Sequence, residues 1–494
     1  MNIFGLLFLL ITQLITGRGL IELFKLQMRP ILVFCCSMLC GVALFSFLPF
    51  ILELFHVAIT FSSVTIAIVV TTVIFLVPII LNFRNIKLPD LKSIKLPPIY
   101  EYPFWIVFGL LLFVSVWRCY YYPPNARDML SGPEVMADFA IKEHHIINSV
   151  FQIDLQSTNN YLKPPYIIGL QIIYKLFVQQ IGQLWLSVIT LCFTAMIFTL
   201  LKEKLHFVIV GFIMLYFFCM PEVYAYSYLM LFDYSNMVYF FGGFYFLNRY
   251  FESRKANELY FSIFMFSIAT YVRTETLILV GMLIPLIAYH QFKDKLPVVK
   301  SALRIAMLLI FPFIVYFLCM NVYVKHFIPV HYDVTGDVNK NLGDVSYFFN
   351  RLTDMSSKLI FSEAGLMYYG YYPHLFLIII LADIIFFRKF STEAITMLYG
   401  IALVYIGLAF IGYLLPLADL MHTTKRGLFK MFPLILLYYR NSGLLQKLTG
   451  VINNWELGKP GDTTPKPKPQ PVKATAGAPA AKPAPATAGA GKRK

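Results

Sequence analysis

Long apolar runs recur throughout this sequence, and each is close to the length that carries a helix across a lipid bilayer, about 20 residues. They lie near residues 3–17, 31–53, 57–82, 103–118, 166–201, 205–220, 228–247, 259–291, 302–323, 374–387, 393–415 and 427–440. The chain is 59% hydrophobic and only 14% charged, whereas a soluble domain of this length exposes far more charge. The runs are also too long to be strands of a membrane barrel. The sequence therefore predicts an all-α, polytopic bundle of about 11–13 transmembrane helices.

The positions of Lys and Arg predict the orientation of this bundle, because cytoplasmic loops hold these residues in excess. The basic loops contain Arg18, Lys25 and Arg29; Arg84, Lys87, Lys92 and Lys95; Lys202 and Lys204; Arg249, Arg254 and Lys255; Lys293, Lys295 and Lys300; and Arg388 and Lys389. All of them can be cytoplasmic at once if the N-terminus is outside. Two large loops, 120–165 and 324–373, then face outward.

Composition sets the end of the chain apart from the hydrophobic spans before it. Residues 456–494 form a tail of mostly Lys, Pro, Ala, Gly and Thr. Such a composition cannot form a core, so the tail is expected to be disordered and cytoplasmic. It is expected to bind anionic lipids, or alternatively to dock a partner. The net charge of +15 therefore reflects the tail and the cytoplasmic loops rather than a nucleic-acid surface.

Two apolar runs are too long for a single span. Residues 166–201 contain the polar break VQQIGQ and predict either one broken helix or two short ones. Residues 259–291 are interrupted by YVRTETL, which predicts two short helices joined within the membrane by a turn that carries Arg273 and Glu275. Charges at that depth are costly and usually face a bundle interior or a wet cavity, so both are candidates for a site.

Cysteine spacing indicates neither a disulfide framework nor a metal site. Six of the cysteines lie in apolar runs, only Cys119 lies at a loop boundary, and the sequence has no CxxC pair. The contiguous Glu143, His144 and His145 point around a helix rather than at one point, so they make a poor metal site. His144 is instead a candidate for acceptor contact or proton relay, or is simply solvated.

The loop 120–165 concentrates acidic residues on short amphipathic helices. Asp128 follows a span and the pair Pro123-Pro124, near the outer headgroups. There it could act as a general base toward an acceptor hydroxyl, or it could cap the helix that starts beside it. Glu134 is the rival acid in the same loop.

Three cations are candidates for binding a phosphate. Lys163 precedes two prolines that suit the first turn of a helix, and it either snorkels to the surface or binds a lipid-linked phosphate. Arg273 lies in the interrupted span, and Arg426 lies at an outward helix end, against the positive-inside bias. Asp233 is an intramembrane acid that either pairs with one of these arginines or belongs to an active site. His422 is a further candidate beside Arg426.

Five segments resemble the GT-C superfamily of polyprenyl-phosphate-sugar-dependent glycosyltransferases. They are RDMLSG after a span, YLKPPYIIGLQIIYKLF, MPEVYAYSYLMLFDYSNMVYFF, YVRTETLIL and KRGLFKMFPLIL, which together cover roughly residues 100–440. The resemblance is closest to the branch of protein O-mannosyltransferases and aminoarabinose lipid A transferases, which typically show an R-E-M-x-x-S-G-like segment and a K-P-P or H-P-P step. It implies a catalytic core in residues 101–442, preceded by extra transmembrane helices in residues 1–100, in a bacterial inner membrane. With the orientation expected from the charges, the N-terminus and both large loops are then periplasmic.

The resemblance also implies roles for the candidate residues. The catalytic acid maps to Asp128, although many relatives carry an Asp-Glu pair closer to the preceding span, and this leaves Glu134 as an alternative. Lys163 matches the lysine near the donor phosphate in the aminoarabinose branch, and Arg273 and Arg426 fit cationic positions.

The implied reaction is an inverting, metal-independent transfer that needs no cofactor. A sugar moves from a polyprenyl phosphate to a glycan, lipid or protein hydroxyl. A lipid-linked oligosaccharide flippase or another transporter is the alternative from a different class, although inverted repeats usually give a transporter paired interrupted helices, and only one is evident here.

Overall fold

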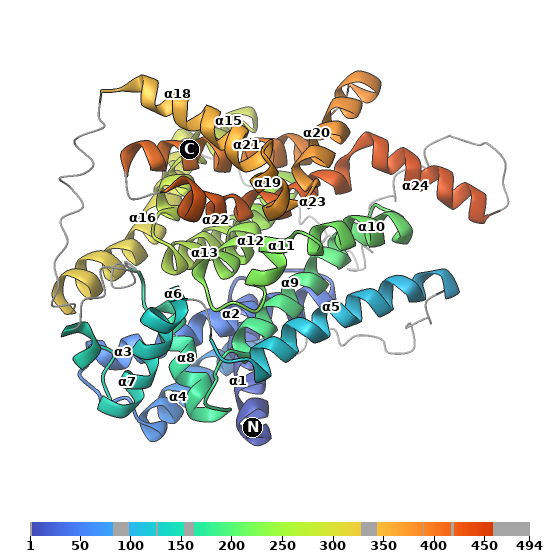
Figure 1. Ribbon diagram of the computed structural model, residues 1–494. Coiled ribbons are helices and arrows are strands. Elements are labelled where there is room, and N and C mark those ends of the chain that lie inside the picture. The colour runs from blue at the N-terminus through green and yellow to red at the C-terminus, as the bar shows by residue number, and fades with distance from the viewer. Residues whose placement is uncertain are drawn as a thin grey trace, which may run out of the picture. The chain divides into compact units, whose positions relative to one another are not determined.

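The structure is a computed structural model that describes residues 2–82, 98–124, 127–152, 163–327, 343–388, 390–415 and 419–457. Most of the chain, Met1–Thr449, forms one compact unit, and Gly450–Lys494 is assigned to a second. The basic loop at 84–95 and the tail from residue 458 lie outside the described residues, as does part of the second large loop, 328–342. Among the residues that are described, all regular elements are helical (Figure 1), which confirms the all-α prediction.

The first half of the chain folds into a series of helices, in which the label η marks a 3₁₀ or π segment. They are α1 (Ile3–Leu23), α2 (Pro30–Ser46), α3 (Leu48–Leu54), α4 (Phe61–Leu81), η3 (Ile99–Glu101), α5 (Tyr102–Tyr121), α6 (Arg127–Met129), η4 (Leu130–Glu134), α7 (Val135–Glu143), η5 (Ser149–Gln152), α8 (Tyr166–Phe177), α9 (Leu184–Lys202), α10 (Phe207–Phe218), α11 (Pro221–Tyr226) and α12 (Phe232–Ser253).

The second half continues in the same way. It contains α13 (Ala256–Val272), α14 (Thr276–Gly281), α15 (Ile284–Lys293), α16 (Val298–Phe317), η8 (Leu318–Phe327), α18 (Val345–Asp354), η9 (Met355–Ile360), α19 (Glu363–Tyr369), α20 (Tyr372–Ala382), η10 (Asp383–Phe387), α21 (Thr392–Leu414), η11 (Leu420–Thr424), α22 (Lys425–Gly427), η12 (Leu428–Met431), α23 (Phe432–Asn441) and α24 (Gly443–Glu456).

Within the described ranges, eight helical stretches are long and apolar enough to cross a membrane, or nine if α19 and α20–η10, bent by 90°, form one broken span. This is fewer than the expected 11–13, because several expected spans fold as shorter or more polar helices. The helices α8 and α10 have 12 residues each, and α13 has 17. The more polar α12 is buried over almost its whole length. A helix enclosed by other helices needs no apolar outer surface.

Both unusually long apolar runs are broken where the sequence predicts a break. The run 166–201 folds as two helices, α8 and α9, which meet at the polar stretch 178–183. The run 259–291 is interrupted after α13, and a short turn leads into α14. The first run thus consists of a helix of 12 residues and a helix of 19 residues, and the second consists of α13 followed by the shorter α14 and α15.

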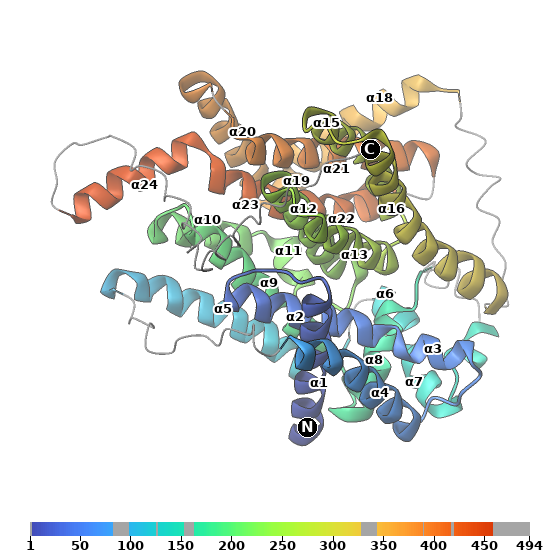
Figure 2. The same cartoon turned by 180° about the vertical axis from the view of Figure 1, so that it is seen from behind.

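The first helices pack closely because glycines remove side chains from their contact. A Cβ on Gly17 of α1 would lie 1.7 Å from the carbonyl oxygen of Ser37 in α2, and one on Gly41 would lie 2.0 Å from that of Gln13. Small residues let membrane helices approach to backbone contact in this way. Figure 2 shows α1, α2 and α4 gathered together, and α2 also packs on α8 and α9. Residues before 100 thus belong to the same compact unit as the rest of the bundle.

Basic loops that are far apart in the sequence meet at one end of the bundle. Arg29, between α1 and α2, lies 3.3 Å from Glu203 at the end of α9. Glu203 also binds Arg440 at the end of α23, at 2.6 Å. Lys204 binds Glu393 at the start of α21, at 2.6 Å. These contacts define what we call the basic end of the bundle.

Candidate functional site

A buried ion pair joins α12 and α13 at the end of this helix pair that lies away from the basic end. The two helices are antiparallel neighbours (Figure 1), linked by residues 254–255. Near this link Arg249 binds Glu258 at 2.6 Å. At the opposite end Arg273, which ends α13, pairs with Asp233 in the first turn of α12. The pairing of Asp233 with an arginine, one of the two sequence interpretations, is therefore present.

The turn between α13 and α14 supplies a second acid to the same guanidinium. The Nε of Arg273 lies 2.5 Å from a carboxylate oxygen of Glu275. The side chain of Asp233 is 3% exposed and that of Arg273 is 13% exposed. Charges in such a place are stable only when they are paired and hydrogen-bonded, so this triad fixes the turn.

Arg426 connects this triad to the first large loop. Its Nη1 lies 3.4 Å from Asp128 and 3.9 Å from Asp233. Arg426 is 14% exposed, whereas the Asp128 side chain is 37% exposed. The Arg426 guanidinium thus contacts both the solvent-exposed carboxylate of Asp128 and the buried carboxylate of Asp233.

Two lysines extend the group. The Nζ of Lys430, in η12, lies 4.0 Å from Glu275, and its side chain is 1% exposed. Lys163 is half-buried, with its Nζ 5.2 Å from the centre of the Phe232 ring. Burial, followed by the positive charges of Arg273 and Arg426, lowers the pKa of the Lys163 ammonium to about 8. Because the charges of Arg273 and Arg426 act on Lys163, we include this lysine in the same group of residues.

The residues brought together here form what we call the charged cluster. Its members are Asp128, Lys163, Asp233, Arg273, Glu275, Arg426 and Lys430. Four cations therefore face three carboxylates, and the cluster has one positive charge in excess. Several guanidinium and ammonium groups around a solvent-reached edge form a good site for a phosphate, which arginine binds through two parallel hydrogen bonds.

Glu134, the rival acid of the loop, has contacts on α8 instead. Its carboxylate accepts hydrogen bonds from Lys175 at 2.6 Å and from Gln171 at 2.8 Å. Lys175 also binds Asp138 of α7 at 2.8 Å. Burial raises the pKa of the Glu134 carboxyl even though Lys175 acts in the opposite direction. This ion-pair network holds η4 and α7 against α8 and so positions the loop that carries Asp128.

The two candidate histidines hold backbone segments in place. The Nδ1 of His144 lies 3.1 Å from the carbonyl oxygen of Ile59, and the Ile59 amide donates to the His144 carbonyl at 2.7 Å. His422 is 78% exposed, and its ring lies 2.5 Å from Asp419. The carbonyl oxygen of His422 accepts a hydrogen bond from the Nε of Arg426 at 2.8 Å. His422 therefore orients Arg426 through its backbone.

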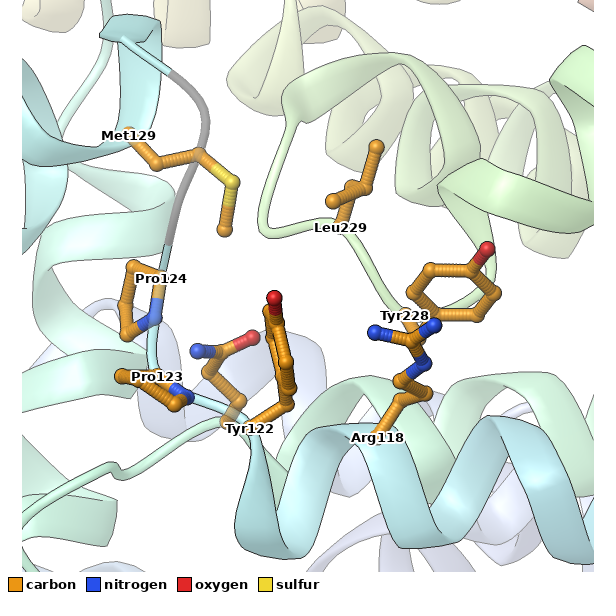
Figure 3. A pocket seen from close by; sticks show the side chains of 8 residues that line it. Arg118, Tyr122, Pro123, Pro124, Met129, Tyr228 and Leu229 are labelled. Atoms are coloured by element: carbon orange, nitrogen blue, oxygen red, sulfur yellow. The ribbon is translucent and has the colours of Figure 1, made fainter.

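A small cavity lies beside the loop that carries Asp128 (Figure 3). It has a volume of about 30 Å³, far below the roughly 300 Å³ of the smallest small-molecule sites, so it is too small for a sugar ring. Figure 3 shows Arg118 beside Tyr228, with Met129 on the other side of the cavity and Tyr122 between them. The Arg118 guanidinium carbon lies 4.6 Å from the centre of the Tyr122 ring and 5.6 Å from that of Tyr228. These cation–π contacts anchor the end of α5.

Sequence reasoning missed one residue that matters for this arrangement, Lys175, which anchors the loop. It had the signal of a cation inside an apolar run, where charge is costly. Lys430, which joins the charged cluster, was recognised with Arg426 as a cation at an outward helix end, against the positive-inside bias.

No family model matches this chain, and neither a curated protein nor a solved structure matches it. In the part of the chain that the structure describes, no group of three or more His, Cys, Asp or Glu side chains could hold a metal ion.

Proposed function

We propose that this protein is an integral membrane glycosyltransferase of the GT-C type. It would transfer a sugar from a polyprenyl phosphate to a hydroxyl of a glycan, lipid or protein at the periplasmic face of an inner membrane. The observation that carries the proposal is the contact of Arg426 with both Asp128 and Asp233 inside a group that has one positive charge in excess. This contact joins an exposed acid to a phosphate-binding set of cations.

The two acids suit different roles. Asp233 is buried and bound to Arg273, so it serves to hold the arginines in place. Asp128 is the more exposed acid and can meet an acceptor that arrives from water. A donor phosphate that binds Arg426 would compete with Asp128 for the guanidinium. Donor binding would therefore make the Asp128 carboxylate available to accept a proton.

The reaction follows from these positions. The acceptor oxygen attacks the anomeric carbon, and the bond between that carbon and the phosphate oxygen breaks on the opposite side. The phosphate leaves with the bonding electrons, and Asp128 takes the proton of the acceptor hydroxyl. Lys163, Arg273 and Arg426 stabilise the charge that develops on the leaving phosphate. The configuration at the anomeric carbon inverts.

The face of the membrane on which the charged cluster lies follows from the face on which the basic end lies. If the positive-inside rule holds, the basic end and the tail are cytoplasmic, and anionic lipids there would attract the tail. The charged cluster contains the end of α13 that is remote from the 254–255 link, so it would lie toward the periplasm.

The experiment that tests the proposal is mass spectrometry of lipid-linked sugars and glycoconjugates in cells that lack the protein. A transferase mutant accumulates one sugar-phosphate lipid and lacks one modification. The identified donor is then added to the purified protein in proteoliposomes. Release of free polyprenyl phosphate supports a transferase, whereas movement of intact donor across the bilayer would identify a flippase.

A further inference from the structure

A second cavity opens at the basic end of the bundle, and its volume is about 440 Å³. This lies within the range of small-molecule sites, about 300–1,000 Å³. Its wall includes Arg29 from the link between α1 and α2, Glu203 from the end of α9, Arg249 from α12 and Arg440 from α23. Four chain segments therefore build it together.

Three guanidinium groups line this cavity, and partners hold two of them in place. Arg249 binds Glu258 at 2.6 Å and the carbonyl oxygen of Gln27 at 2.8 Å. Arg440 lies between two acids and binds Glu203 at 2.6 Å. Arg29 is 61% exposed and approaches Glu203 at 3.3 Å. A fixed pair of guanidinium groups with a third at the rim is a favourable arrangement for a phosphate group.

Groups that can accept or donate further hydrogen bonds lie in the same wall. Asn248 is 3% exposed, and its amide nitrogen donates to Glu252 at 3.3 Å. The carboxylates of Glu203 and Glu252 can accept hydrogen bonds from hydroxyl groups.

We propose that this cavity binds a small phosphate ester that also carries hydroxyl groups, of the kind found in glycerophosphate. The arginines take the phosphate, and the carboxylates of Glu203 and Glu252 accept hydrogen bonds from the hydroxyls. The same chemistry occurs in a soluble phosphate ester and in the headgroup of an anionic glycerophospholipid. This site lies at the opposite end from the charged cluster and does not depend on the proposed transferase activity.

The test uses the full-length protein in nanodiscs of phosphatidylcholine alone and of phosphatidylcholine with phosphatidylglycerol. Native mass spectrometry measures retained phosphatidylglycerol, and calorimetry measures binding of glycerol 3-phosphate. Arg29→Gln removes the guanidinium with the fewest structural contacts and should weaken binding about tenfold or more. Met28→Trp should block the cavity without a change of charge. Lys25→Gln, in the same link but outside the cavity wall, is the matched control and should bind like the wild type.

The outcomes separate the two sources of the ligand. Uptake of glycerol 3-phosphate in phosphatidylcholine discs assigns the cavity to a soluble phosphate ester. Retention of phosphatidylglycerol without uptake of the soluble compound assigns it to a lipid headgroup. Binding of neither would overturn the proposal. So would equal losses in Arg29→Gln and Lys25→Gln, since these would reflect surface charge alone.

Discussion

At the scale of single residues, the charged cluster gives similar side chains different tasks. Asp128 and Asp233 contact the same arginine, but one is 37% exposed and the other 3% exposed. Removal of the exposed acid should affect chemistry, and removal of the buried one should affect folding. Exposure, rather than residue type, therefore separates their roles.

Asp128→Asn should reduce transfer by about 10²–10⁴-fold, because a positioned base contributes a factor of this size. Its thermal stability should stay near wild type, and its donor affinity should not fall, because no carboxylate then competes with the donor phosphate for Arg426. Asp233→Asn should instead destabilise the protein by about 3–5 kcal/mol, since it removes the partner of a buried guanidinium. Turnover assays and thermal unfolding in detergent measure the two effects.

Glu134→Gln is the matched variant for this comparison, because it changes the other acid of the same loop. It should retain transfer within a few-fold. If Glu134→Gln is inactive and Asp128→Asn is active, the base has been assigned to the wrong acid.

Arg426→Ala should weaken binding of the sugar-phosphate lipid by about one to two orders of magnitude. This loss corresponds to one charge-assisted hydrogen bond, which is worth about 1.5–3 kcal/mol. Arg426→Lys should recover only part of the loss, because lysine keeps the charge but lacks the planar fork. Lys358→Ala, in an exposed ion pair with Asp354, is the control. Equal donor affinities in both alanine variants would show that Arg426 does not bind the phosphate.

Donor affinity should also depend on pH through Lys163. Its pKa of about 8 means that the ammonium is mostly charged at neutral pH and loses its proton above pH 8. Attraction for a phosphate should therefore fall as the pH rises through this value, by up to about tenfold per unit as the proton is lost. Lys163→Arg should remove this dependence, because guanidinium stays charged. Titration of donor binding from about pH 6 to about pH 10 spans the lowered pKa of Lys163, and identical profiles for both proteins would contradict the assignment.

At the scale of elements, short helices bring the loop acid of the candidate site to the ends of the longer α12 and α13. Asp128 lies in α6, and the ion pairs between Lys175 of α8 and the acids Glu134 and Asp138 hold the following helix in place. The position of Asp128 therefore depends on an interaction that touches no substrate.

Lys175→Met should destabilise the protein by about 3–5 kcal/mol, because it leaves two acids beside one another without their cation. Adding Glu134→Gln should restore part of the stability, since the two sites are in contact and their effects are not additive. Thermal unfolding of both single variants and the double variant measures the coupling. A double variant as unstable as Lys175→Met would mean that this ion pair does not anchor the loop.

At the scale of the whole molecule, ion pairs between distant segments give the bundle two chemically distinct ends. One gathers basic loops around a large cavity, and the other holds the charged cluster at the remote end of the α12–α13 pair. Such a difference between the two ends would suit an enzyme that takes its donor from the membrane and its acceptor from water.

The sidedness can be measured by labelling with a membrane-impermeant maleimide. Cys219 is the exposed cysteine and the other six are buried, so Cys219→Ser gives a low background. Leu130→Cys, at a 49% exposed position two residues after Asp128, should react in intact spheroplasts. Lys25→Cys, at the basic end, should react only after permeabilisation. The reverse pattern would show that the orientation is inverted.

The sequence alone determined the fold class and much of the candidate site. Lipid offers no hydrogen bonds to an exposed backbone, so long apolar runs must form helices, and the polar breaks at 178–183 and 273–275 mark where they end. Intramembrane charge is costly, and this cost alone marked Asp233, Arg273 and Glu275 as candidates.

Only the tertiary structure decided which charges meet. Arg426 contacts Asp128, which lies 298 positions away along the chain. The residues around either side chain do not indicate that the two meet. Packing likewise places Lys175 beside Glu134, and this contact supports our proposal of Asp128 rather than Glu134 as the base. Ion pairs act over a few ångströms in space, so they depend on how helices pack, whereas apolar length and local breaks act along the chain itself.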